Sequence, residues 1–297
     1  MRRGPLYMIA AGLVFTVMLA LVKSARAELS AFDVVFWRGL TAASLAYWLA
    51  RGVSQRLPER RYALLALRTV LGFAAMSCSF TAAKGIGIAD LSLIAKMQPL
   101  IIALLAPLVL GSGERSGLRV WLLMLVGMCG CVVLLAPDLA VGSVYGLLAL
   151  AGASFAALAK LCVRALAPVT AARTLVFYFQ AGAMALALVA IAVLEHRLPV
   201  LPAPGLWPVL AGIGVTATLG QLLMTRAYAH DRAPVVAAAT YTVPLWGLIA
   251  DLVVFSLVPD WSVIAGGIII MTAGLLLVFA PGPTPALPDP DPALADP

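Results

Sequence analysis

The chain repeats one pattern of apolar runs in its two halves, and this repeat limits its possible folds more than any other feature. Pro99 lies in the stretch ADLSLIAKMQPL, and Pro244 lies 145 residues later in APVVAAATYTVPL. Each stretch continues into an apolar run, a short loop with one acidic residue, and a glycine-rich segment that closes in Ala-Pro at Pro137 or Pro281. Repeats of this length in an apolar chain are typical of membrane transporters built from two related halves.

The composition indicates that the surrounding solvent is lipid. Hydrophobic residues make up 63% of the chain and charged residues 11%, whereas a soluble domain has about 25% charged residues. The four cysteines lie in apolar runs and lack the spacing of a zinc site. We therefore expect reduced cysteines, no metal and no cofactor.

Ten runs approach the length of about 20 apolar residues that a bilayer crossing needs. They are 5–22, 30–50, 62–83, 91–110, 120–136, 142–163, 174–194, 206–225, 233–257 and 262–280. We predict an all-α membrane protein with one five-helix repeat over 1–138 and a second over 139–281. Because five is odd, the second repeat enters the membrane upside down. The proline-rich segment 282–297 cannot bury a core and is expected to be a disordered cytoplasmic tail.

The distribution of basic residues predicts the orientation. With a cytoplasmic N-terminus, twelve Arg and Lys residues fall in cytoplasmic segments and four in the opposite segments. Such a bias places both chain ends in the cytoplasm. The net charge of +7 is then mostly membrane anchoring, and no basic patch interleaved with aromatic residues indicates nucleic acid.

Degenerate motifs in both halves are similar to those of the drug/metabolite transporter superfamily, and specifically to its paired EamA-type domains. The residues that carry the resemblance are Phe36-Trp37-Arg38, Pro99, Glu114, Gly127, Gly130, Pro244, Asp260, Gly267 and Gly274. The resemblance covers roughly residues 5–280. It implies a carrier of the bacterial inner membrane, most often an exporter of amino acids or other small metabolites. The Phe-x-Arg pattern and Tyr241 are more similar to the branch of S-adenosylmethionine and riboflavin carriers.

Four ionisable residues inside the spans are candidates for the binding site, because charges in a bilayer tend to face a cavity or a partner. Arg38, Arg68 and Lys96 are basic and Asp251 is acidic. Two positive charges would remain without compensation, so we expect either a water-filled cavity or an anionic ligand. Snorkelling to the interface, above all by Arg68, and contacts with backbone carbonyls are the alternatives.

Pro99 and Pro244 are predicted to break their helices at matching positions. A proline within a helix frees a backbone carbonyl, which in a membrane must find a partner or line a wet cavity. Two helix breaks at equivalent positions indicate the binding site, although two prolines that only shape packing would give the same pattern. The candidate ligand contacts beside them are Lys96, Gln98, Tyr241, Thr242 and Trp246.

These features predict a secondary transporter that moves an anionic or zwitterionic metabolite, such as an amino acid or a nucleotide-like compound, by alternating access. The expected partners are the small-molecule substrate, the lipid bilayer, and protons or a counter-substrate, with Asp251 as a coupling group or ion-pair partner. The protein is expected to be a monomer or a weak dimer. The alternatives are an importer or exchanger of a vitamin or S-adenosylmethionine, and an accessory membrane subunit. An enzyme is disfavoured, because no nucleophile–base pair or metal motif is present.

Overall fold

The structure is a computed structural model that describes residues 3–51, 59–82, 85–86, 88–135, 144–246, 249 and 261–278. The regular secondary structure of these residues is helical, which confirms the predicted all-α class. The α-helices are α1 (Arg3–Ala25), α2 (Ala31–Leu49), α3 (Glu59–Ala82), α4 (Ile88–Ala95), α5 (Gln98–Val109), α6 (Leu118–Leu135), α7 (Val144–Leu166), α8 (Ala172–Leu194), α9 (Trp207–His230), α10 (Ala233–Ala238) and α12 (Trp261–Val278). The 3₁₀ helices are η1 (Ser112–Glu114), η2 (Pro204–Leu206) and η3 (Ala239–Thr242).

Several of these helices have the length and apolar surface of membrane spans. Among the described residues, five segments are long and apolar enough to cross a bilayer: Arg3–Val22, Arg61–Ser79, Val144–Leu166, Ala172–Leu194 and Pro204–His230. Large apolar side chains such as Leu108 (77% exposed) and Leu118 (75% exposed) lie on the outside of the bundle. Such surfaces need lipid to cover them, and the chain is a multi-pass membrane protein.

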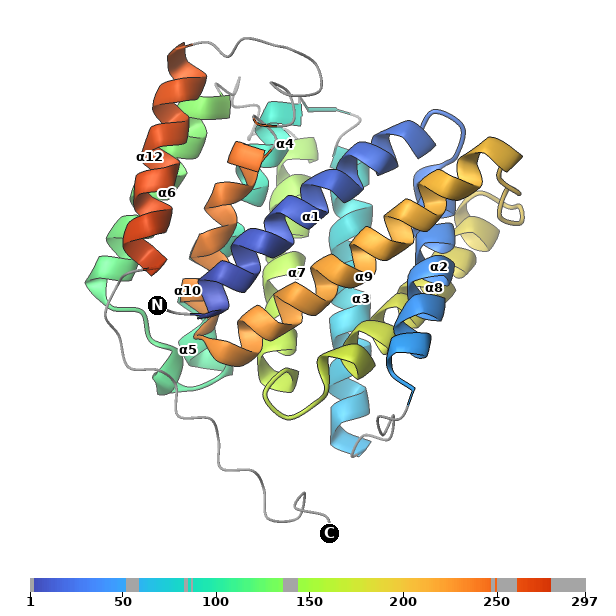
Figure 1. Ribbon diagram of the computed structural model, residues 1–297, viewed down its shortest axis with the longest axis horizontal. Helices are drawn as coiled ribbons and strands as arrows, with labels where there is room; N and C mark the ends of the chain where they lie inside the picture. Colours follow the sequence, from blue (N-terminus) through green and yellow to red (C-terminus); the bar gives the residue numbers. More distant parts are fainter. Residues whose placement is uncertain are drawn as a thin grey trace.

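The helices pack in pairs that join the two halves of the sequence. Figure 1 shows α1 beside α9 across the front of the bundle and α6 beside α12 at its left edge. Behind them α3 packs on α7, and α2 packs on α8. Under the predicted repeat, α1 corresponds to α7 and α3 to α9. The pseudo-two-fold axis would then relate the α1–α9 pair to the α7–α3 pair. The inversion and the count of ten remain predictions, and the boundary at 138/139 and the tail 282–297 lie outside the described residues.

Glycine permits the closest approach between α6 and α12. A Cβ atom added to Gly266 would lie 2.6 Å from the backbone nitrogen of Leu134 and 2.7 Å from the carbonyl oxygen of Gly130. Backbone atoms cannot move aside as the end of a flexible side chain can. Small residues at such contacts are typical of helix packing in membranes.

Two of the predicted spans are broken rather than continuous. The span 91–110 is divided into α4 and α5 at Lys96 and Met97, whose backbone N–H groups donate to carbonyls three residues back. Pro99 is the second residue of α5, where a missing N–H is tolerated. In the other half, α10 passes into η3 before Pro244. In both halves the break therefore precedes the proline.

Candidate functional site

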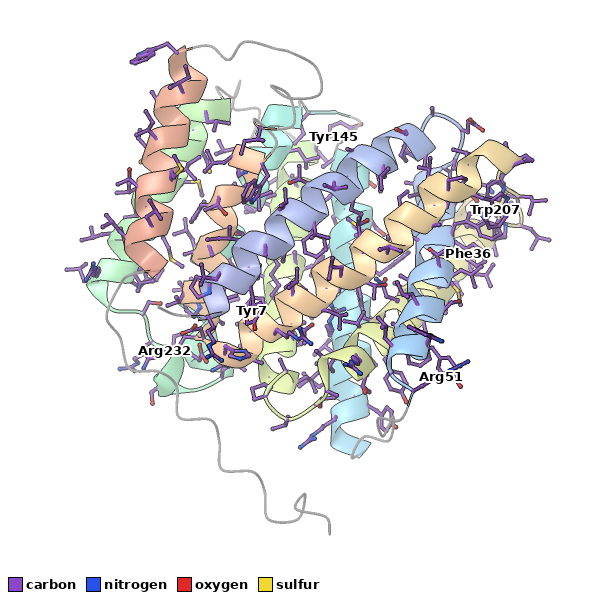
Figure 2. The ribbon with its side chains drawn as sticks, viewed as in Figure 1. Tyr7, Phe36, Arg51, Tyr145, Trp207 and Arg232 are labelled. Atoms are coloured by element: carbon purple, nitrogen blue, oxygen red, sulfur yellow. The ribbon has the colours of Figure 1, made fainter. Side chains whose placement is uncertain are left out.

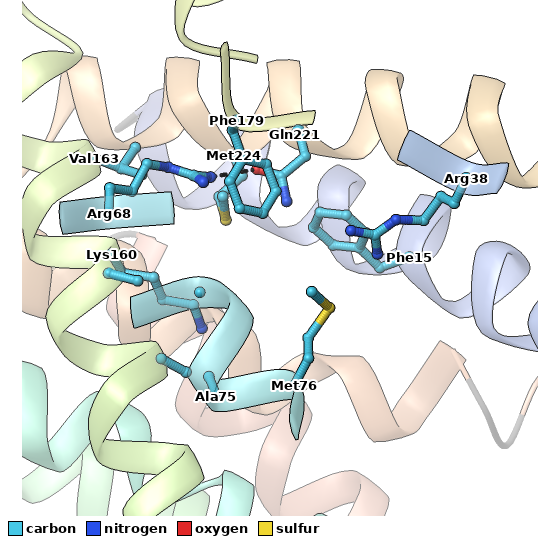
Figure 3. A pocket seen from close by; sticks show the side chains of 13 residues that line it. Phe15, Arg38, Arg68, Ala75, Met76, Lys160, Val163, Phe179, Gln221 and Met224 are labelled. Carbon is cyan, nitrogen blue, oxygen red and sulfur yellow. Dashed lines mark hydrogen bonds between the residues drawn. The ribbon is translucent and has the colours of Figure 1, made fainter. Parts of the chain in front are cut away.

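A cavity of about 240 Å³ lies within the bundle between six helices (Figure 3). Helices α1, α2, α3, α7, α8 and α9 each contribute to its wall. Its lining consists of Phe15, Arg38, Arg68, Gly72, Ala75, Met76, Ala156, Ala159, Lys160, Val163, Phe179, Gln221 and Met224. The volume suits a compact ligand, since pockets for drug-sized molecules begin at roughly 300 Å³.

The wall of this cavity is positively charged. Arg38, Arg68 and Lys160 line it, and no acidic residue does so among the described residues. Three described carboxylates are engaged elsewhere: Glu114 pairs with Arg164, and Asp33 and Glu195 pair with Arg197. The described part of the cavity therefore has three cations and no counter-ion.

Arg68 is held in place by neighbours on two other helices. Its Nη2 donates a 2.9 Å hydrogen bond to Oε1 of Gln221 on α9. Its guanidinium carbon lies 3.5 Å from the centroid of the Phe179 ring on α8, a cation–π distance. The residue is 5% exposed. These contacts argue against the alternative in which Arg68 snorkels to the membrane surface.

Arg38 enters the cavity from α2. Figure 3 shows its side chain reaching in from the side opposite to Arg68. Its Nε atom is buried and has no hydrogen-bond partner among the described residues. A buried N–H without an acceptor is costly unless a ligand or water supplies one.

Lys160 is a cavity residue that the sequence analysis did not select as a candidate. Its Nζ donates to Oε1 of Gln98, the first residue of α5. It lies within the predicted span 142–163, three residues before the predicted end. Helix α7 continues to Leu166, which places Lys160 more than one turn inside. Hydropathy alone does not locate a helix end to within one turn.

Lys96 lies at the break between α4 and α5, beside the cavity rather than in its lining. Its Nζ donates to the carbonyl oxygen of Thr240, at 3.4 Å. That carbonyl is four residues before Pro244, so the proline has no N–H to satisfy it. The backbone N–H of Val243 also donates to that carbonyl. Lys96 therefore joins the break in its own half to the break in the opposite half through the Thr240 carbonyl.

The candidates in the second half are buried close to the break. Tyr241 is 2% exposed and packs with Met124 and Cys131, and its hydroxyl has no partner among the described residues. The Thr242 hydroxyl donates to the carbonyl of Ala239 at 2.7 Å. Trp246 faces Gly12 on α1: a Cβ there would lie 3.6 Å from its Nε1. None of the three lines the cavity of Figure 3, and their role in binding remains a prediction.

The remaining predicted site residues divide into two kinds. Pro99 is buried at the start of α5, and Pro244 is partly buried after η3. Asp251 lies outside the described residues. Its part in the charge balance therefore also remains a prediction.

Polar networks secure the two ends of the bundle. At one end Arg164 donates from Nε to Glu114 at 2.8 Å and from Nη1 to the Tyr228 carbonyl at 2.7 Å. The second oxygen of Glu114 accepts from the backbone N–H of Ala233, at 2.7 Å. At the other end Arg197 donates from Nη2 to the Asp33 carboxylate at 2.6 Å. This hydrogen bond raises the pKa of Arg197 above its ordinary value.

Charged and aromatic side chains lie at both ends of the bundle. Figure 2 shows Arg51 and Arg232 toward the end that carries the chain's N-terminus, and Tyr145 and Trp207 toward the opposite end. Trp37 packs edge-on against Trp207, and its Nε1 donates to the Val200 carbonyl at 2.9 Å. Tryptophan lies at both ends, since Trp48 is three residues before Arg51, and the orientation of the chain in the membrane remains a prediction.

Comparison with known proteins identifies the family. Residues 2–136 match the EamA-like transporter family. The chain is 35% identical over 278 residues to a pseudopaline exporter of Pseudomonas aeruginosa, with 93% of this chain and 96% of that protein covered. It is 28% identical to an uncharacterized transporter of Helicobacter pylori, with coverage of 92% and 94%.

A solved structure agrees on the fold. A crystal structure of a protein with 21% sequence identity superimposes with a TM-score of 0.78, covering 93% of this chain and 98% of the other. At that identity the likeness speaks for the fold alone. Together with the pseudopaline exporter, which matches over nearly the whole chain, the family match means that the chain is a transport protein, not an enzyme, and belongs to the EamA-like family of drug/metabolite transporters.

Proposed function

We propose that this protein exports a compact metabolite with an anionic group across the bacterial inner membrane by alternating access. The observation that carries the proposal is the convergence of Arg38, Arg68 and Lys160 on one cavity without a described carboxylate. Uncompensated cations in a low-dielectric region are costly, and an anionic ligand removes that cost on binding. The planar fork of arginine suits a carboxylate or a phosphate.

Export is supported by a relative. The pseudopaline exporter matches over nearly the whole chain, and pseudopaline is therefore one of the compounds to test. An S-adenosylmethionine-type substrate is the weaker alternative, because its sulfonium cation would lie beside three cationic side chains. A purely accessory subunit has no evident need for an internal cavity with charged walls.

Alternating access is supported by the arrangement of the broken helices. Lys96 at one break contacts the Thr240 carbonyl at the other, so movement of either half changes the contact between them. In the proposed inverted repeat, both halves alternate around the cavity and both chain ends are cytoplasmic.

Coupling is assigned to Asp251 as a hypothesis with two forms. The carboxylate either pairs with a cation or takes up a proton, since burial favours the neutral carboxyl. Asp251→Asn separates the forms. Loss of gradient-driven accumulation with retained counterflow supports proton or counter-substrate coupling, and loss of folding supports an ion pair.

A ligand screen tests the proposed substrate class. The melting temperature of the purified protein is measured with acidic, zwitterionic and cationic metabolites, pseudopaline included, because binding raises stability by mass action. We expect stabilisation by acidic compounds, its loss in Arg38→Gln, and its retention in Arg119→Gln, a control at the exposed start of α6. Stabilisation by hydrophobic cations alone would overturn the proposal.

A further inference from the structure

The cations near the cavity fall into two groups. Arg38 from α2 and Arg68 from α3 lie on opposite sides of the upper part of the cavity in Figure 3. Lys160 from α7 lies below both arginines in that view, and its Nζ donates a hydrogen bond to Gln98 on α5. We call Arg38 with Arg68 the arginine pole and Lys160 the lysine pole. In Figure 3 the side chain of Lys160 points toward the space between Arg68 and Met76.

Each pole retains donors for a ligand. An arginine has five N–H donors and a lysine has three. Among the described residues, Arg68 donates to Gln221 and Lys160 to Gln98, while the buried Nε of Arg38 has no partner. A ligand with one carboxylate would bind at one pole. The N–H donors of the other pole would then lack an acceptor, and its positive charge would lack a counter-ion.

Apart from the three cations and Gln221, the cavity is lined by apolar residues. The rings of Phe15 and Phe179 and the thioethers of Met76 and Met224 line it. Such walls suit a short carbon chain and offer no acceptor for an ammonium group. A plain zwitterionic amino acid fits poorly, because it brings one carboxylate and adds a cation to three that are already present.

From this arrangement we infer that the substrate of the proposed carrier has two acidic groups joined by a short carbon chain, one held by Arg38 and Arg68 and the other by Lys160. The inference rests on the proposed function and narrows it to dianionic metabolites. Lys160 is accordingly a specificity-determining residue, which selects dianions over monoanions. The small cavity restricts the length of the linker.

Three five-carbon probes measure how much the second acidic group contributes to binding affinity. Glutarate, pentanoate and 5-aminopentanoate share one chain and carry at its far end a carboxylate, a methyl group or an ammonium. Equilibrium binding to the full-length protein is measured for each, and for succinate, adipate and pimelate with their monocarboxylate counterparts. The best dicarboxylate should bind at least about tenfold tighter than its monocarboxylate, the factor expected of a hydrogen bond to a charged group. 5-Aminopentanoate should bind most weakly of the three five-carbon probes.

Substitutions at Lys160 assign that gain. Lys160→Gln should remove the preference for the dicarboxylate over its monocarboxylate. Lys160→Arg keeps the charge and should retain most of the gain, which excludes a loss through misfolding. Arg119→Gln should alter none of the affinities.

Different results would overturn the inferred dianion preference and the proposed function. Equal affinities for mono- and dicarboxylates, or a dicarboxylate preference that survives Lys160→Gln, overturn the inference and leave anion export standing. Failure of every dicarboxylate in the series to bind also overturns it, while binding of another acidic metabolite in the screen would preserve the proposed function. Preference for 5-aminopentanoate over glutarate and pentanoate overturns the inference, but it leaves the proposed function standing because this zwitterion also carries a carboxylate.

Discussion

Lys160 on α7 donates a hydrogen bond from its ammonium group to the side-chain amide of Gln98 at the start of α5. Gln98 directly precedes Pro99 at the break in the fourth predicted span. This bond therefore ties a cationic wall of the cavity to the broken helix. A ligand that competes for the lysine would act on the position of α5 as well.

Replacement of Gln98 by glutamate tests this link. In Gln98→Glu the new carboxylate would pair with Lys160 and cancel its charge, so affinity for acidic ligands should fall about tenfold or more. Titration of purified protein measures the effect. Gln98→Met serves as the control, because it removes the acceptor but preserves the charge of Lys160. Unchanged acid affinity in Gln98→Glu would show that Lys160 takes no part in binding.

Glu114 and Arg164 should be strongly coupled in stability. Both are at least nine-tenths buried, and Glu114 also accepts from the start of α10. Removal of one partner of a buried pair costs about 3–5 kcal/mol, because it leaves the other charge without compensation. Glu114→Ala should lower the free energy of unfolding by about that amount. The double variant Glu114→Ala/Arg164→Met should cost less than the sum of the single variants. Additive losses would argue against the coupling.

The contact of α6 with α12 should not tolerate a side chain at Gly266. In Gly266→Ala the added methyl group meets the backbone of Leu134 at 2.6 Å, and overpacking of this kind costs about 1–3 kcal/mol. Gly274→Ala on the same helix should cost less, since its nearest contact is the Thr242 side chain at 3.0 Å. Thermal unfolding in detergent gives the ranking. Equal melting temperatures for the two variants would contradict the close packing.

Topology is tested by reporter fusions. Fusions after Pro137 and after Pro281 should report opposite sides of the membrane, with the second in the cytoplasm, because five predicted spans separate them. A reporter that is active on the same side at both positions rules out the inverted repeat.

The sequence predicted the helices better than it predicted their neighbours. Apolar length located segments such as 174–194, which the structure has as Ala172–Leu194. Hydropathy does not report how a helix is rotated about its axis. Rotation decides that Lys160 lines the cavity and that Tyr241 packs among Met124 and Cys131. That rotation is set by long-range packing against other helices.

The breaks show the same division between local and distant causes. The two prolines marked both interrupted spans in the sequence. The residues that form a contact between the two breaks are far apart in the sequence. Lys96 donates to the Thr240 carbonyl, which lies 144 residues later in the chain. Such a pairing depends on the fold and has no local sequence signal.

Release of a mixed pool of metabolites from proteoliposomes tests the central claim most directly. Vesicles containing the purified protein are loaded with acidic, zwitterionic and cationic metabolites, and each compound outside is quantified by mass spectrometry over time. The account predicts selective release of acidic compounds by the wild-type protein, none above the leak of empty vesicles by Arg68→Gln, and wild-type release by Arg119→Gln. Selective release of cations, or undiminished release of acids by Arg68→Gln, would contradict it.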